Sequence, residues 1–275
     1  MSVTKLNMVK ALNLALLQEM ERDPAVLILG EDVGVDGGVF RVTDDLQRKF
    51  GSQRVIDSPL EMVIRMPYGG GVRALEHHTE SEEQFYAHVP GLKMVIPSGP
   101  RTARALLTSA IRDPDPVVFF ESKALYHAAK EEVPADPEAL PIGRAQVVRE
   151  GRDLTLIAYG AMLRVAREAA DVLQAEDRVE TEVVDLLTIA PLDRETIVTS
   201  VAKTGRAVVV HEAPRSFGPG AEVAASIMEG AFLHLEAPVR RVTANDVSFV
   251  GFAREKAHVP DVARVAAAAR ETLAF

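Results

Sequence analysis

The sequence predicts an α/β protein built from two parallel-sheet domains. Short apolar runs alternate with amphipathic helical stretches along the chain, as in proteins whose parallel sheets are covered by helices. The length of 275 residues suits two domains of about 150 residues each. A stretch containing Pro134, Pro137 and Pro141 interrupts the alternation and indicates a surface linker. We therefore expect one domain over residues 1–140 and a second over residues 145–275.

The first domain is expected to start with a helix over its first 20 residues, where apolar side chains recur at helical spacing and Asn7 can cap free amides. Residues 26–29 are all apolar, which predicts a strand buried on both faces. Ser98 as a cap and Pro100 in the first turn favour a helix over 103–111. Further strands are expected over 54–56, 62–66, 93–96 and 117–120, with a short helix over 44–50.

The second domain repeats this alternation. Its strands are expected over residues 153–159, 181–186, 207–211 and 239–242. Its helices are expected over residues 162–173, 194–202, 222–232 and 262–273.

Composition excludes several classes of protein. With 31 basic and 40 acidic residues the net charge is −9, which argues against nucleic acid or an anionic membrane as the main partner. The absence of cysteine excludes disulfides, thiolate metal sites and a cysteine nucleophile, and it fits a cytoplasmic protein. No export signal is recognisable, and every apolar run is too short to cross a bilayer. We expect a soluble protein.

One region is chemically dense, whereas common cofactor motifs are missing. The sequence has no phosphate loop of the G-x-x-x-x-G-K-[ST] type, no G-x-G-x-x-G and no H-E-x-x-H. Residues 65–73 carry three successive glycines, Gly69 to Gly71, which let a backbone come close to a ligand or another chain. His77 and His78 follow, and histidine is the residue type that most often serves in proton transfer. From chemistry alone, a functional loop and a tight connection with two solvated histidines are both open.

At this point the sequence shows a family resemblance. It resembles the beta subunit of thiamine-diphosphate-dependent 2-oxo acid dehydrogenases, the first component of the pyruvate and branched-chain 2-oxoisovalerate complexes. Arg65-Met66-Pro67-Tyr68-Gly69 and His78-Thr79-Glu80-Ser81 are among the matching motifs. The other matching segments are 29–34, 37–40, 50–51, 55–60, 90–93, 109–113, 132–134 and 203–206.

The resemblance implies a fold, a reaction and partners. The fold would be a transketolase-type pyrimidine-binding domain followed by the transketolase C-terminal domain. The chain would act with an alpha subunit in a heterotetramer of two alpha and two beta chains. The alpha subunit would hold Mg²⁺ and the diphosphate of the cofactor. The reaction would be oxidative decarboxylation of a 2-oxo acid with acyl transfer to lipoamide on an acyltransferase core.

The sequence departs from the family after Leu60. The family has several tens of residues there, and in this chain Leu60-Glu61 runs almost directly into Met62. The resemblance makes Glu61 the candidate for the glutamate that hydrogen-bonds the aminopyrimidine ring of the cofactor. Its position is one residue earlier than in the family, so a surface glutamate at a junction is an equal alternative.

The resemblance also assigns His78. Its family counterpart stabilises charge or moves a proton around the substrate and the incoming lipoyl group. His77 is expected to point elsewhere, and Ser81 to help fix the loop or simply to form a turn. The other histidines, including His211, are expected to be ordinary.

A structural potassium ion is the third implied feature. In the family it lies at the end of the helix predicted here over 103–111, where free carbonyl groups favour a cation. The alternative is an ordinary helix end at Asp113-Pro114. The candidate ligands carried over from the family are Met62, Ala110, Ile111, Asp113 and Asp115.

Two functions of different kinds follow. The first is the catalytic beta subunit described above. The second is a non-catalytic assembly or binding subunit that has lost part of the cofactor site after Leu60. A single-chain transketolase-like enzyme is disfavoured because the chain has no room for a further cofactor domain. Lys123-Ala124-Leu125-Tyr126 resembles the branched-chain enzymes slightly more than the pyruvate enzymes, and the substrate stays open.

Overall fold

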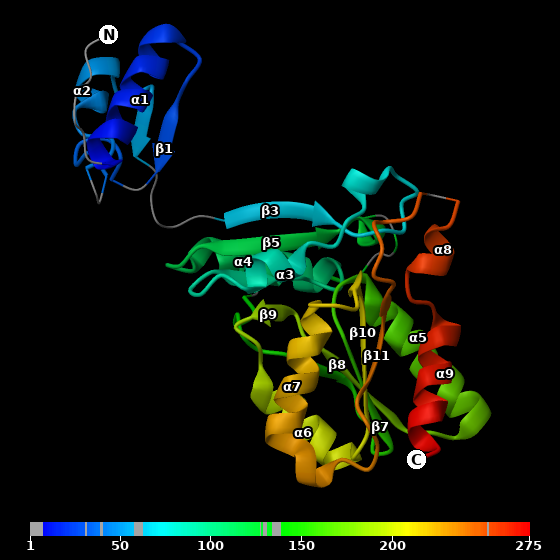
Figure 1. Cartoon of the computed structure of the whole chain (residues 1–275). Coiled ribbons are helices and arrows are strands. Elements are labelled where there is room, and N and C mark those ends of the chain that lie inside the picture. Colours follow the sequence, from blue (N-terminus) through cyan, green and yellow to red (C-terminus); the bar gives the residue numbers. More distant parts are fainter. Residues whose placement is uncertain are drawn as a thin grey trace. The chain divides into compact units, whose positions relative to one another are not determined.

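The computed structural model divides into two compact units, Met1–Met62 and Val63–Phe275 (Figure 1). It describes residues 8–30, 32–38, 41–57, 63–126, 128, 131–133, 139–251 and 253–275. Asn7, Glu61, Met62, Pro134 and Pro137 lie outside these residues. The units meet earlier in the chain than the predicted domain boundary near residue 140, which stays a prediction.

The first unit is a small α/β body. Helices α1 (Met8–Arg22) and α2 (Leu46–Phe50) accompany the parallel strands β1 (Ile28–Gly30) and β2 (Val55–Asp57). Met20, Leu46 and Val55 form its buried core. The expectation of a strand buried on both faces is wrong, because Leu29 is 64% exposed. Within this unit no described element covers the side on which Leu29 lies.

The second unit holds a four-stranded sheet in the order β3-β5-β4-β9. Strands β3 (Val63–Tyr68), β5 (Val117–Ser122) and β4 (Lys93–Val95) are parallel, and β9 (Thr188–Ala190) is antiparallel to β4. Helix α4 (Pro100–Arg112) packs against β5, and the short helix α3 (Glu83–Ala87) lies near β4. Single 3-10 turns cover Glu76–His78 and Lys123–Leu125.

A five-stranded sheet forms the rest of this unit, in the order β11-β10-β7-β8-β6. Strands β7 (Leu154–Ala158), β8 (Thr181–Asp185), β10 (Ala207–Pro214) and β11 (Arg240–Ala244) are parallel, while β6 (Gln146–Arg149) is antiparallel. Helices α5 (Ala161–Asp177) and α9 (Val262–Leu273) pack together on one face, and α6 (Arg194–Thr204) and α7 (Pro219–Ala231) pack on the other (Figure 1). The short helix α8 (Glu255–His258) lies between β11 and α9 in the chain.

Most predicted elements are present within a few residues of their expected bounds. The cap of α4 is Gly99 rather than Ser98, because Thr102 Oγ1 accepts hydrogen bonds from the backbone N–H of both residues at 3.1 Å. The antiparallel strands β6 and β9 and the short helices α3 and α8 were not predicted, because each is too short to show a periodic pattern. In the described part of the chain, no helix combines the length and apolar character that spanning a membrane requires.

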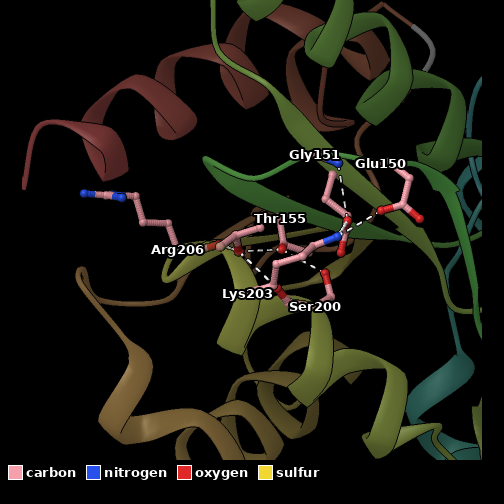
Figure 2. Close-up of polar contacts among 8 residues, drawn as sticks. Glu150, Gly151, Thr155, Ser200, Lys203 and Arg206 are labelled. Atoms are coloured by element: carbon pink, nitrogen blue, oxygen red, sulfur yellow. Dashed lines mark hydrogen bonds and ion pairs between the residues drawn. The ribbon is translucent and has the colours of Figure 1, made fainter.

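A polar cluster lies at the amino ends of the strands of the five-stranded sheet (Figure 2). We call Thr155, Glu182, Ser200, Lys203 and Thr204 the amino-end cluster. Thr155 Oγ1 contacts Ser200 Oγ at 2.9 Å and Thr204 Oγ1 at 2.7 Å. Lys203 Nζ donates to the buried Glu182 carboxylate and, at 2.9 Å, to Glu150. The 203–206 motif is thus explained by packing in this fold.

Candidate functional site

The two neighbouring histidines lie on a loop after β3. Both are exposed residues of the 3-10 turn Glu76–His78. Their ring centroids are 4.0 Å apart, so the two rings lie next to each other, and the expectation that His77 points away from the substrate stays a prediction. The His78 ring is therefore available to a molecule that approaches from solvent or from another subunit.

The loop is closed at its base by backbone hydrogen bonds. Gly69 N–H donates to the carbonyl of Glu80 at 2.9 Å, so residues 69–80 form a closed loop. Inside it, His78 N–H donates to the carbonyl of Leu75 at 2.9 Å. Thr79 is fully buried, and its hydroxyl donates to the carbonyls of Leu75 and Glu76. The buried threonine thus anchors the backbone immediately after His78.

The three glycines form the turn between β3 and this loop. Gly69 has a φ of +81°, and a Cβ there would lie 2.8–3.0 Å from the carboxylate of Glu212. Gly71 has a φ of +87°, and a Cβ there would lie 2.9 Å from Ala124. Positive φ and these close approaches both require glycine. The groups that the turn admits belong to this same chain, whereas the sequence had suggested a ligand or another chain.

Titratable groups gather next to the turn, at the carboxyl ends of the strands. We call Tyr68, Glu83, Tyr159, His211 and Glu212 the carboxyl-end cluster. All five are buried, and the Tyr159 hydroxyl donates to Glu83 Oε1 at 3.3 Å. Gly70 N–H donates to Glu212 Oε2 at 3.0 Å. Among the described residues, Glu83 Oε2 and Glu212 Oε1 have no hydrogen-bond partner.

Burial changes the proton affinity of this cluster. It raises the pKa of Glu83 to about 8, with further increase from the charge of Glu212. It also raises the pKa of Glu212 to about 7, against the hydrogen bond from Gly70. Burial lowers the pKa of His211 to about 4, so that ring is neutral at pH 7. The cluster can therefore hold or release protons near neutral pH through its carboxyl groups.

His211 itself is packed as a core residue, in line with the sequence prediction. Its ring is stacked on Tyr159 with centroids 6.1 Å apart. A Cβ at Gly220 would lie 2.5 Å from its Nε2, and one at Gly218 would lie 2.8 Å from its ring. The glycines before and in α7 are thus needed to accommodate this ring.

Glu83 and Glu212 were missed by the sequence analysis. Glu212 stands in β10 directly after an apolar run at the carboxyl end of a parallel strand, which is where such sheets place functional groups. That position was a usable signal. Glu83 gave none, because it belongs to a five-residue helix whose burial depends on tertiary packing.

The predicted potassium ligands are engaged with a cation of the protein itself. Lys93 Nζ donates to both carboxylate oxygens of Asp113, at 2.7 and 2.8 Å, and pairs with Asp115 at 2.9 Å. The lysine hydrogen bond helps hold the pKa of Asp113 below its usual range, although burial acts in the opposite direction. These carboxylates do not fit a potassium ion while Lys93 binds them. A site at the carbonyl groups of Ala110 and Ile111 stays a prediction.

The described residues hold no group of three acidic or histidine side chains arranged to bind a metal ion. Glu61 and Met62 lie outside the described residues, so their predicted roles stay predictions.

Comparison with known families settles the relationship. The pattern described as "Transketolase, pyrimidine binding domain" matches residues 4–61 and 59–128, and "Transketolase, C-terminal domain" matches residues 143–265. The pyruvate dehydrogenase E1 component subunit beta of Acholeplasma laidlawii is 39% identical, over 97% of this chain and 97% of its own length. The chain belongs to the beta subunits of thiamine-diphosphate-dependent 2-oxo acid dehydrogenases. The corresponding subunit of Staphylococcus epidermidis is 41% identical, over 99% of this chain and 100% of its own.

A solved structure agrees on the fold of this beta subunit. It is described as "Split gene transketolase, inactive beta4 tetramer", with a TM-score of 0.64 and 22% identity over 96% of this chain and 97% of that one. This likeness supports the predicted transketolase-type α/β fold.

The family pattern is interrupted where the sequence analysis expected it. The pyrimidine-binding pattern matches in two pieces that meet at residues 59–61. The alignment with the Acholeplasma subunit spans 319 positions against 275 residues in this chain, so at least 44 positions have no counterpart. The interruption coincides with the boundary between the two compact units.

The described residues of this beta subunit fit only part of a thiamine diphosphate site. Backbone amides of a glycine turn are suitable ligands for a diphosphate. Here the amides of Gly70 and Gly71 already donate to Glu212 and Glu255. His78 remains exposed on the loop that follows these amides.

Proposed function

We propose that this chain works with an alpha subunit in the oxidative decarboxylation of a 2-oxo acid and the transfer of the acyl group to lipoamide. The observation that carries the proposal is the exposed His78 on a loop closed at its base, in a chain that aligns with pyruvate dehydrogenase beta subunits along nearly its whole length. The cofactor, when bound, supplies the electron sink that decarboxylation needs. The alpha subunit holds its diphosphate and Mg²⁺, and the working unit is two alpha and two beta chains.

The role of His78 is proton transfer or charge stabilisation at the substrate. An exposed imidazole can donate or accept a proton through its ring nitrogens, and closure of a subunit interface over it would exclude water. Glu61, outside the described residues, is the group we assign to the aminopyrimidine ring. The lipoyl-bearing acyltransferase core is the acceptor of the acyl group.

Pyruvate is the first substrate to test, with 2-oxoisovalerate as the comparison. The 123–126 segment, which resembles the branched-chain enzymes slightly more, makes contacts within the chain, and the substrate stays open. Lys123 Nζ donates to the carbonyl of Pro67 at 3.1 Å, and the Tyr126 hydroxyl donates to Glu121 at 2.7 Å. These contacts stabilise β3 and β5 and favour neither substrate.

The test compares His78→Ala with His77→Ala in the complex with the cognate alpha subunit, thiamine diphosphate and Mg²⁺. Acyl transfer to lipoamide should fall by about 100- to 10,000-fold for His78→Ala, the usual contribution of a general acid or base. The loss for His77→Ala should be much smaller. Equal mild losses in the two variants would remove His78 from its role.

A second candidate function is a non-catalytic assembly subunit. The interruption at residues 59–61, next to Glu61, favours it. Normal assembly with the alpha subunit but no activity in the unmutated complex would support this alternative. Restoring the relatives' residues after Leu60 should then restore activity.

A further inference from the structure

Two carboxylates from distant parts of the sequence hold the glycine turn. Glu212 in β10 accepts the hydrogen bond from Gly70 N–H at 3.0 Å. Glu255 in α8 accepts from Gly71 N–H with Oε1 and from Arg73 N–H with Oε2, the latter at 3.0 Å. Both carboxylates are buried, with 4% of each residue exposed. Figure 1 shows α8 beside the loop that follows β3.

These bonds are strong and directional. A carboxyl oxygen accepts a backbone N–H in either protonation state, and the bond is about twice as strong when the carboxyl group is ionised. Glu255 uses both of its oxygens on amides two residues apart, which fixes the direction of the backbone there as well as its distance. The middle glycine, Gly70, also has no room for a side chain. A Cβ there would lie 3.1 Å from Glu255 Oε1 and 2.8 Å from the Phe249 ring.

The held amides lie at the start of the loop that carries His78. The loop begins at Gly69 and closes at Glu80. Arg73, the last held residue, has a φ of +53°, a backbone conformation that non-glycine residues rarely adopt. The backbone of the loop is thus fixed at its start by Glu212 and Glu255 and at its end by buried Thr79.

We propose that Glu212 and Glu255 are positioning residues for His78. They act through the backbone of the glycine turn, and they do not contact the substrate. This inference rests on the proposed function for its catalytic meaning, while the positioning itself is a property of the isolated chain.

The experiment measures the isolated full-length chain by NMR. Glu255→Ala removes both acceptors, and Glu255→Gln keeps one oxygen acceptor in a side chain of the same length. The control is Glu271→Ala, an exposed carboxylate on α9 that pairs with Arg240 and does not touch the turn. Amide hydrogen exchange is read at Gly71 and Arg73, and ring-proton chemical shifts are read at His77 and His78.

In Glu255→Ala, exchange at both amides should be about 10- to 100-fold faster, as expected for a region that opens locally. The histidine ring shifts should also move, because the two rings are 4.0 Å apart and aromatic rings this close shift each other's signals. Glu255→Gln should restore protection at one of the two amides, and the control should change neither readout. Unchanged exchange, or faster exchange with unchanged histidine shifts, would overturn the proposal.

The same variants also separate this inference from the proposed function. In the active complex, Glu255→Ala should lower kcat with little change in KM for the 2-oxo acid. An inactive unmutated complex would count against the proposed function, while the exchange and shift data would still decide the positioning role.

Discussion

The amino-end cluster and the carboxyl-end cluster lie at opposite ends of β7, which carries Thr155 and is followed by Tyr159, and they are built differently. In the amino-end cluster, Thr155 contacts two hydroxyl groups, and the buried Glu182 carboxylate binds the Lys203 ammonium. In the carboxyl-end cluster, no lysine or arginine is paired with Glu83 or Glu212 within the described ranges, and each keeps an oxygen without a partner. The buried carboxylate of the amino-end cluster is thus paired with a cation, whereas the two buried carboxyl groups of the carboxyl-end cluster are not.

The difference indicates which end serves function. Buried polar groups are normally hydrogen-bonded, since leaving one unpaired costs about 1–3 kcal/mol. Such costs are tolerated mainly at functional sites. The carboxyl groups without a cationic partner, Glu83 and Glu212, lie at the carboxyl ends of the strands, next to the glycine turn and the His78 loop, which is also where open parallel sheets place ligands.

The largest loss of stability should come from removing the ion pair between Lys203 and Glu182 in the amino-end cluster. Lys203→Met leaves the Glu182 carboxylate buried without its cation, which costs about 3–5 kcal/mol for a fully buried pair. Because Lys203 is 43% exposed, solvent should reduce the loss to about 2–3 kcal/mol. Urea denaturation measures it. In Lys203→Met combined with Glu182→Gln the loss should be smaller, and an equal loss would mean that the ion pair does not stabilise this end.

The pH dependence of stability should show the proton that the carboxyl-end cluster holds on Glu83. The folded-state pKa of Glu83 is about 8, far above the usual value near 4.5, so the folded protein binds a proton that the unfolded chain releases. Its stabilisation is fully present below about pH 4.5 and is lost as pH rises to about 8, at up to about 1.4 kcal/mol per pH unit.

Glu83→Gln should flatten this slope. The comparison is sharpest from pH 7 to 8, above the pKa of about 7 that burial gives Glu212 and Asp185. His211, with a pKa of about 4, acts in the opposite direction between about pH 4 and 6.5 and does not contribute here. Parallel stability curves for the two proteins would show that Glu83 does not hold a proton.

A smaller effect is expected at Thr155. Thr155→Val keeps the shape of the side chain but leaves the hydroxyls of Ser200 and Thr204 without this partner. The expected loss is about 1 kcal/mol, as for a typical buried hydrogen bond. Thermal unfolding measures it, with Thr196→Val at the start of α6 as a separate hydroxyl loss. A variant as stable as the parent would show that the Thr155 hydroxyl does not stabilise the fold.

The smallest effect concerns the predicted potassium ion. If Lys93 supplies the cation for Asp113, then Asp113→Ala should lower the melting temperature equally in potassium and in tetramethylammonium buffers. A bound ion would stabilise the folded state only when present. A larger loss in potassium buffer would favour the metal site.

Elements with a long periodic pattern were predictable from the sequence, and tertiary choices were not. Apolar runs in the sequence were enough to locate strands β7, β8 and β10. Apolar stripes at helical spacing were enough to locate helices α4, α5 and α9. His78 could be singled out because its motif is specific to the family. The hydrogen bonds from Gly71 and Arg73 to Glu255 could not be predicted, because they join residues more than 180 positions apart through backbone amides. Lys93 was missed for the same reason, since nothing local pairs it with Asp113.

Strand β3 has a further consequence for handling the protein. It is the first strand in the order β3-β5-β4-β9, so one side of its backbone borders no other described strand. Such an edge can template pairing with another chain, and natural edges oppose this with charges and proline. Here Arg65 and Pro67 are of those types, beside a partly exposed Ile64. Arg65 and Pro67 should oppose pairing through this strand, and Arg65→Val should lower the protein concentration at which self-association begins.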